Sequence, residues 1–188
     1  ALGKHLRLGA IIDAGIVDLH SACAWHLLRK GEAQPVRLAN ALVPPGMLGF
    51  LQGEITSMTF AKAALDDVRK AVASGTAPLG INEATIIFRP GDVKLAAPLP
   101  RPGSMRDFYA FEQHVKKGFE KRGEPMPQEW YEMPVYYKGA HWSIIGPEEE
   151  VRWPSFTEQF DYELELAVII GKQGRNIAEG QAREYIAG

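Results

Sequence analysis

The sequence predicts an α+β protein, rich in β-structure, in which a small α+β domain at residues 1–97 precedes a second domain at residues 98–188. Three observations support this fold class. Short runs of β-branched residues lie between turn residues, apolar residues recur at helical spacing, and prolines interrupt the chain near residue 97. A chain of 188 residues can form one domain or two small ones with a buried core.

The first elements of the N-terminal domain are two short strands within residues 4–20. A turn at Ala14 and Gly15 separates their β-branched residues. A helix is expected to follow over residues 21–31, where Gly31 ends it.

A second helix is expected over residues 60–75. Leu65, Val68 and Val72 recur at spacings of three and four, and Gly75 supplies the stop. Short strands are expected next, at residues 84–88 and 93–99.

A proline-rich linker opens the second domain, because three prolines and a glycine fall within residues 98–103. We expect a helix over residues 106–123, and then a long irregular segment rich in aromatic residues and proline. Residues 151–171 are typical of a strand that enters a buried sheet, and residues 176–188 begin another helix.

The composition excludes several classes of protein. The net charge is −2 and no run of Lys or Arg builds a basic face, so nothing indicates a nucleic-acid partner. No apolar stretch is long enough to span a bilayer, and residues 1–10 carry no signal-peptide core. The single cysteine, Cys23, excludes an intrachain disulfide and a cysteine-based zinc site, so we expect the reducing cytoplasm.

Asp107 and His114 form the first candidate constellation. On a helix over residues 107–119 they point almost the same way, at the edge of an apolar stripe of Phe108, Phe111, Val115 and Phe119. Such a pair suits a metal ligand and a general base. The alternative is structural, with Asp107 as the N-cap of the helix and His114 as an edge residue.

Glu163 and Glu165 form the second constellation. In a strand, residues two apart share a face, so both carboxylates could converge on one cation. Oxygen ligands suit Mg²⁺, Mn²⁺ or Ca²⁺ rather than zinc. The alternative is a half-exposed strand with a solvated acidic face, against which the apolar run Leu166–Ile170 argues.

Three stretches together resemble the fumarylacetoacetate hydrolase superfamily. They are RPGSMRDFYAFEQHV, PVYYKGAHWSIIGP and FDYELELAVIIGKQGRNI, in the order and at the separations typical of that family. The resemblance covers about residues 95–188 and implies that residues 98–188 are the first part of a catalytic domain built as a mixed β-roll.

The resemblance also implies the roles of seven residues. Asp107, Glu163 and Glu165 would be ligands of a divalent cation (Mg²⁺, Mn²⁺ or Ca²⁺), and His114 the general base. Tyr109, Tyr137 and, one residue out of register, Arg122 would contact the substrate. A fourth carboxylate ligand and a catalytic lysine are expected beyond Gly188.

The activity implied by the resemblance is hydrolysis of a C–C bond in a small keto acid, a 1,3-diketo acid or acylpyruvate, in the catabolism of aromatic compounds. His114 would deprotonate the attacking water. One alternative is a decarboxylase or isomerase of the same family that acts on oxaloacetate or a 2-hydroxy-diene diacid. Another is a catalytically incomplete metal-binding fragment. Family members are commonly dimers, so a homodimer is expected.

Overall fold

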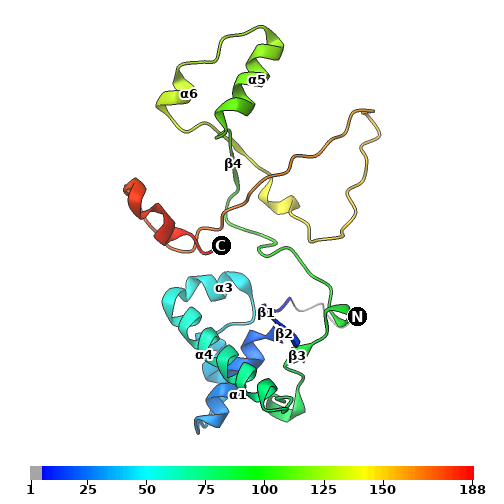
Figure 1. Ribbon diagram of the computed structural model, residues 1–188, viewed down its shortest axis with the longest axis vertical. Coiled ribbons are helices and arrows are strands. Elements are labelled where there is room, and N and C mark those ends of the chain that lie inside the picture. The colour runs from blue at the N-terminus through cyan, green and yellow to red at the C-terminus, as the bar shows by residue number, and fades with distance from the viewer. Residues whose placement is uncertain (1–5) are drawn as a thin grey trace. The chain divides into compact units, whose positions relative to one another are not determined.

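The chain divides into two compact units in the computed structural model, which describes residues 6–188 (Figure 1). The first unit runs to Ala96 and also includes Glu148–Gly188. The second unit is Ala97–Pro147.

A three-stranded antiparallel sheet lies in the first unit. Its order is β1 (Gly9–Ile12), β2 (Gly15–Asp18) and β3 (Ile87–Phe88). Ile12 pairs with Gly15, so β1 and β2 form a hairpin with a two-residue turn. Gly15 has φ +138° and any Cβ there would lie 2.4 Å from the Phe88 carbonyl oxygen, so only glycine fits.

The sequence therefore predicted this hairpin correctly, although the turn comes one residue earlier than expected. Of the strand expected at residues 84–88, only residues 87–88 form β3. The part of the prediction that falls on residues 4 and 5 lies outside the described residues.

Four helices complete this part of the unit: α1 (Leu19–Arg29), α2 (Pro35–Leu42), α3 (Met47–Gln52) and α4 (Glu54–Ala73). The two predicted helices are confirmed as α1 and α4. Both end as their glycines indicate, because Gly31 (φ +84°) and Gly75 (φ +77°) are left-handed. In each case the residue after the glycine donates its N–H to a carbonyl in the last turn, at 3.0 Å and 2.9 Å.

The core of this unit lies where α1 packs on α4 and α2 and where these helices meet the sheet (Figure 1, blue to teal). Small residues at helical spacing let α4 approach α1 closely. The buried positions of α4 are Ser57, Ala61, Ala64 and Val68. Val17 of β2 and Ile86 are fully buried against them.

The predicted strand at residues 93–99 is wrong. After the short 3₁₀ helices η1 (Ile81–Glu83) and η2 (Pro90–Asp92), the chain runs without regular structure to β4. A strand needs a partner for its backbone groups, and among the described residues none pairs with this stretch.

The second unit contains a two-stranded antiparallel sheet and two helices. These are β4 (Arg106–Phe108), α5 (Glu112–Arg122), α6 (Glu129–Glu132) and β5 (Tyr136–Lys138), and the 3₁₀ helix η3 (His141–Ser143) follows. The predicted helix over residues 106–123 begins only at Glu112. Residues 106–108 instead pair with β5, and Gly123 (φ +69°) ends α5 as predicted.

The predicted strand over residues 151–171 is also wrong for the chain as described. Residues 160–169 lie in no strand, and the side chain of Leu164 is 94% exposed. Only Ile170 forms a bridge, with Ile186, next to the 3₁₀ helix η4 (Glu179–Tyr185). η4 stands where an α-helix was expected. Apolar residues on both faces make a strand only where other strands cover them.

The α+β class is confirmed, since small sheets and helices share the chain. The β-rich description is not, because the five strands of the described residues have two to four residues each. The β-roll stays a prediction. Among the residues that the structure describes, no helix is both long and apolar enough to cross a membrane.

Candidate active site

Five of the seven candidate residues lie in the second unit. They are Asp107, Tyr109, His114, Arg122 and Tyr137. Glu163 and Glu165 belong to the first unit. The local structure of the second unit therefore decides how most of the predicted site is arranged.

Asp107 and Tyr137 lie opposite each other in the β4–β5 pair. Side chains that are directly opposite in an antiparallel pair project from the same face of the sheet, so the carboxylate and the phenol are neighbours. Both residues are exposed to solvent. The next pair in the register, Phe108 and Tyr136, stacks with ring centroids 5.3 Å apart.

The helical relationship predicted for Asp107 and His114 is wrong. Asp107 is a strand residue, and Phe111 occupies the N-cap position of α5 without a side-chain hydrogen bond. Of the predicted apolar stripe only Val115 is fully buried, while Phe108 and Phe111 are 51% and 72% exposed. The reason is the non-local pairing of β4 with β5, which extends the chain through Phe108 and overrides the local preference for helix.

One face of α5 carries His114, Gly118 and Arg122, which are successively four residues apart. Tyr109 lies across this face. Its ring meets the His114 ring edge to face, with centroids 5.9 Å apart and an interplanar angle of 84°. A Cβ at Gly118 would lie 3.2 Å from the Tyr109 hydroxyl oxygen and 3.7 Å from Nη1 of Arg122. The structure thus brings three predicted residues, Tyr109, His114 and Arg122, to one surface.

Arg122 has local partners as well. Its Nε donates to Glu124 Oε2 at 3.0 Å, and its guanidinium lies 4.3 Å from the centroid of the Phe119 ring. The Arg122 and Glu124 side chains are 49% and 57% exposed, so this ion pair is weak and a ligand can replace it.

Glu163 and Glu165 lie in the exposed irregular segment. Among the described residues, neither they nor Asp107 takes part in an ion pair. Within residues 6–188, no three His, Cys, Asp or Glu side chains lie close enough together to hold a metal ion. The neighbouring Asp161 accepts a hydrogen bond from the Tyr162 N–H at 2.8 Å, which fits a local structural role.

Sequence reasoning missed the contacts that α6 makes. Trp130 Nε1 donates to the Tyr109 carbonyl oxygen at 2.8 Å, and the Tyr131 hydroxyl donates to Glu112 Oε1 at 2.7 Å. No local pattern reveals these bonds, because their partners are 21 and 19 residues apart. Gly118, inside the α5 pattern, was an available signal, since glycine destabilises a helix relative to alanine.

Glu112 also receives a hydrogen bond from Lys116, with Nζ 2.6 Å from Oε1. The bonds from Lys116 and then from Tyr131 lower the pKa of the Glu112 carboxyl. The same carboxylate raises the pKa of Lys116 and the pKa of Tyr131. Glu112 is therefore the shared hydrogen-bond partner of Lys116 and Tyr131 in a small polar cluster.

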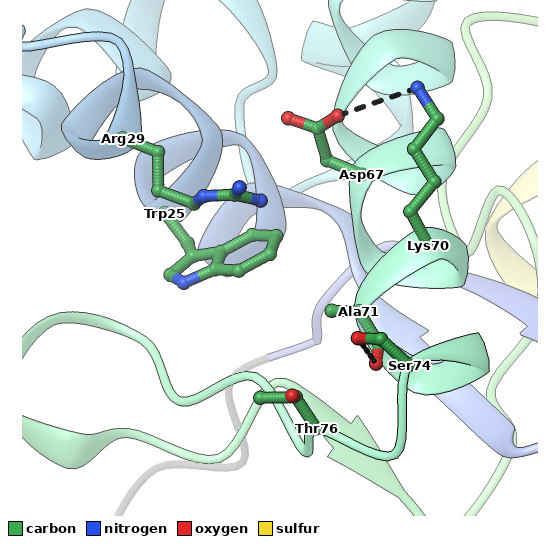
Figure 2. Close-up of a pocket in the computed structure, with 7 residues that line it drawn as sticks. All are labelled: Trp25, Arg29, Asp67, Lys70, Ala71, Ser74 and Thr76. Carbon is green, nitrogen blue, oxygen red and sulfur yellow. Dashed lines mark hydrogen bonds and ion pairs between the residues drawn. The ribbon is translucent and has the colours of Figure 1, made fainter.

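A pocket in the first unit lies between α1 and the end of α4 and contains none of the seven candidates (Figure 2). Its volume is about 480 Å³. The Arg29 guanidinium lies over the Trp25 ring, 4.8 Å from its centroid, and Lys70 pairs with Asp67 (Figure 2). Trp25 also packs against the core.

Comparisons with known proteins found one family match and several relatives. Residues 104–188 match the family described as fumarylacetoacetate (FAA) hydrolase C-terminal. The human protein named oxaloacetate tautomerase FAHD2A, mitochondrial, is 31% identical over 189 residues, which cover all of this chain and 47% of that protein. No solved structure matches the chain significantly.

Two further relatives carry the same kind of name. The oxaloacetate tautomerase fahd2, mitochondrial, of Xenopus laevis is 28% identical over 78% of this chain and 39% of its own length. FAHD2A of Bos taurus is 27% identical over 99% of this chain and 46% of its own length. The chain thus spans about half the length of the curated relatives it matches.

The expectation of a cytoplasmic location is wrong by these comparisons, because the three relatives are named as mitochondrial proteins. The argument from Cys23 failed because a scarcity of cysteine indicates only a reducing environment, and such an environment does not single out the cytoplasm. The comparisons agree with the resemblance that the three stretches within residues 101–177 carry, and the chain belongs to the fumarylacetoacetate hydrolase superfamily.

Proposed function

We propose that this chain contributes to a metal-dependent enzyme that interconverts the keto and enol forms of oxaloacetate or a closely related 2-oxo dicarboxylic acid. The observation that carries the proposal is the Tyr109–His114 contact on the face of α5 that also bears Arg122. Similarity of the whole of this chain to 47% of a human protein named oxaloacetate tautomerase supports this substrate class.

The relatives support this isomerase alternative better than the C–C hydrolysis that was the first expectation. The two reactions differ in what the base must do. Hydrolysis requires an activated water and the departure of a carbon leaving group, whereas tautomerisation moves one proton between C3 and the oxygen on C2. A single imidazole can carry out that transfer without a leaving-group acid.

The residues present fit a hard divalent cation by their chemistry. Asp107, Glu163 and Glu165 offer only carboxylate oxygens, all on exposed residues with no ion-pair partner among the described residues. We propose these three as its ligands, with Mg²⁺, Mn²⁺ or Ca²⁺ as the ion. When bound, the ion would supply Lewis-acid polarisation of the substrate's keto oxygen and so make its C3 protons more acidic.

The side chains of the second unit have separate roles in this proposal. His114 takes the C3 proton on one ring nitrogen and returns it on the oxygen side, or the reverse. The hydroxyls of Tyr109 and Tyr137 donate hydrogen bonds to substrate oxygens. Arg122 leaves its exposed pair with Glu124 and binds a substrate carboxylate through two parallel N–H bonds.

The experiment that tests this function presents three substrates side by side with Mg²⁺. The ultraviolet decay of enol-oxaloacetate, pyruvate release from oxaloacetate and cleavage of an acylpyruvate are measured with the full chain and with buffer alone. We expect accelerated enol decay and no excess of pyruvate or cleavage products. Acylpyruvate cleavage without enol decay would restore the hydrolase interpretation, and cation binding without any turnover would favour an incomplete metal-binding fragment.

The organisation of the molecule is part of the same proposal. We retain a boundary near residue 97 between an N-terminal domain and the first part of a catalytic domain that forms a mixed β-roll. We also retain a homodimer as the assembled state. Sedimentation of the protein at several concentrations tests the dimer, since a mass of one chain at all concentrations would contradict it.

A further inference from the structure

The backbone at Tyr109 is held from two sides. Its N–H donates to the Val135 carbonyl oxygen at 3.3 Å, which continues the β4–β5 pairing one residue beyond the strand. Its carbonyl oxygen accepts from Trp130 Nε1 at 2.8 Å. An indole N–H is a donor only, so this bond fixes which way the carbonyl of residue 109 faces.

The hydroxyl of Tyr109 lies beside Gly118, which has no side chain. The hydroxyl lies where the side chain of residue 118 would begin, because a Cβ there would come within 3.2 Å of the hydroxyl oxygen. That distance is closer than ordinary van der Waals contact, so a residue with a Cβ would require the hydroxyl to shift by a few tenths of an ångström. Gly118 lies inside α5, where glycine costs about 1 kcal/mol relative to alanine.

A second hydrogen bond, from the residue after Trp130, holds α6 against α5 and so restricts the position of Trp130. Tyr131, the next residue, donates to Glu112 in the first turn of α5, and Lys116 holds the same carboxylate. The Trp130 and Tyr131 rings also meet edge to face, with centroids 5.0 Å apart. Two neighbouring residues of α6 thus donate hydrogen bonds to Tyr109 and to Glu112, at the two ends of the turn between β4 and α5.

We infer that Trp130 and Gly118 are positioning residues that hold Tyr109 across the face of α5 bearing His114 and Arg122. The Trp130 indole sets the backbone of Tyr109, and the open space at Gly118 admits its hydroxyl. The hydroxyl then donates a hydrogen bond to the substrate oxygen on which negative charge develops while His114 moves the proton. This inference rests on the proposed function for the reaction, but the placement of Tyr109 can be tested without turnover.

A double-mutant cycle tests the role of Gly118. Gly118→Ala should leave the melting temperature unchanged or raise it, since alanine favours helix, yet lower kcat for enol-oxaloacetate about tenfold with a smaller change in KM. In a Tyr109→Phe background the same substitution should have no further effect, because the hydroxyl it displaces is gone. Lys117→Ala, at an exposed position of α5, is the matched control and should leave kcat unchanged.

Additive losses in the cycle would overturn the inference, as would a Gly118→Ala protein that keeps its kcat. A loss of kcat that merely tracks a lower melting temperature would do the same, since it would show a purely structural role.

A measurement independent of activity follows the Tyr109–His114 contact by nuclear Overhauser effects between the two rings. Trp130→Phe keeps an aromatic ring and removes the indole N–H donor. We expect it to weaken the cross-peak, as Gly118→Ala should, whereas Lys117→Ala should not. An unchanged cross-peak in both variants would overturn the inference. The two results can also differ. If both variants lose the cross-peak but the wild-type protein does not accelerate enol decay, the placement of Tyr109 is upheld and the proposed function is contradicted.

Discussion

The pairing of His26 with Asp67 links α1 to α4 at the residue scale. His26 Nδ1 lies 2.8 Å from Asp67 Oδ2, and this hydrogen bond is the main reason that the pKa of the Asp67 carboxyl is lowered. A carboxyl whose pKa is lowered on folding stabilises the fold above its unfolded pKa of about 3.9, and the contribution is lost as the pH falls through the folded value.

We therefore expect Asp67→Asn to lower the free energy of unfolding at pH 7, with a loss that shrinks steadily once the pH falls below about 4. Urea unfolding at pH 7 and near pH 3 measures it. Asp66→Asn is the matched control, because the Asp66–Arg69 pair is exposed and should matter little at either pH. A loss for Asp67→Asn that is the same at both pH values would contradict this account.

Some residues of the candidate site could be predicted from the sequence and others could not. The resemblance singled out Tyr109, His114 and Arg122, and the structure places them on one surface. The sequence could not reveal Trp130 as the donor to Tyr109, because a hydrogen bond to a backbone carbonyl 21 residues away leaves no local pattern.

At the scale of elements, the start of α1 depends on Asp18. Its side chain accepts from the Ser21 N–H at 2.8 Å and from Arg7 Nη2 at 2.9 Å, and Asp18 is buried. Asp18→Ala should lower the free energy of unfolding by about 1–2 kcal/mol through the lost cap. The lost pairing with Arg7 should add a smaller amount, because the Arg7 side chain is 40% exposed and water can solvate its charge.

Asp18→Asn separates the two contributions, because asparagine caps a helix as well as aspartate does but carries no charge. We expect the asparagine variant to lose less stability than the alanine variant when both are unfolded in urea. Equal losses would mean that the cap contributes nothing.

Elements with local signals could be predicted from the sequence, and elements with distant partners could not. α1, α4 and the β1–β2 hairpin follow from nearby glycines and periodic apolar residues. β4 was predicted as helix because its partner, β5, begins 28 residues after β4 ends. The acidic segment at residues 160–169 was predicted as a strand from its own pattern, yet no strand pairs with it among the described residues.

At the scale of the whole molecule, the proposal assigns Asp107, Glu163 and Glu165 as the ligands of the cation. Glu165→Ala should weaken Mg²⁺ binding at least about tenfold, because one of three anionic ligands is lost. Asp161→Ala, four residues earlier, should leave the affinity unchanged, since among the described residues the Asp161 carboxylate accepts its hydrogen bond from the Tyr162 N–H. Isothermal titration calorimetry measures both variants, and equal Mg²⁺ affinity for Glu165→Ala and the wild type would remove Glu165 from the site.

The reaction itself is the central claim, and hydrogen–deuterium exchange at C3 of oxaloacetate in D₂O tests it most directly. Proton NMR with Mg²⁺ present follows the C3 signal and any products together. The account predicts that the protein accelerates exchange and forms no cleavage or decarboxylation products. His114→Ala should lower this rate about 10²–10⁴-fold. His141→Ala should not change it, because the His141 ring meets the Trp142 ring edge to face and has no role in the proposal. Exchange at the rate of the buffer, or exchange that is unaffected by His114→Ala, would contradict the account.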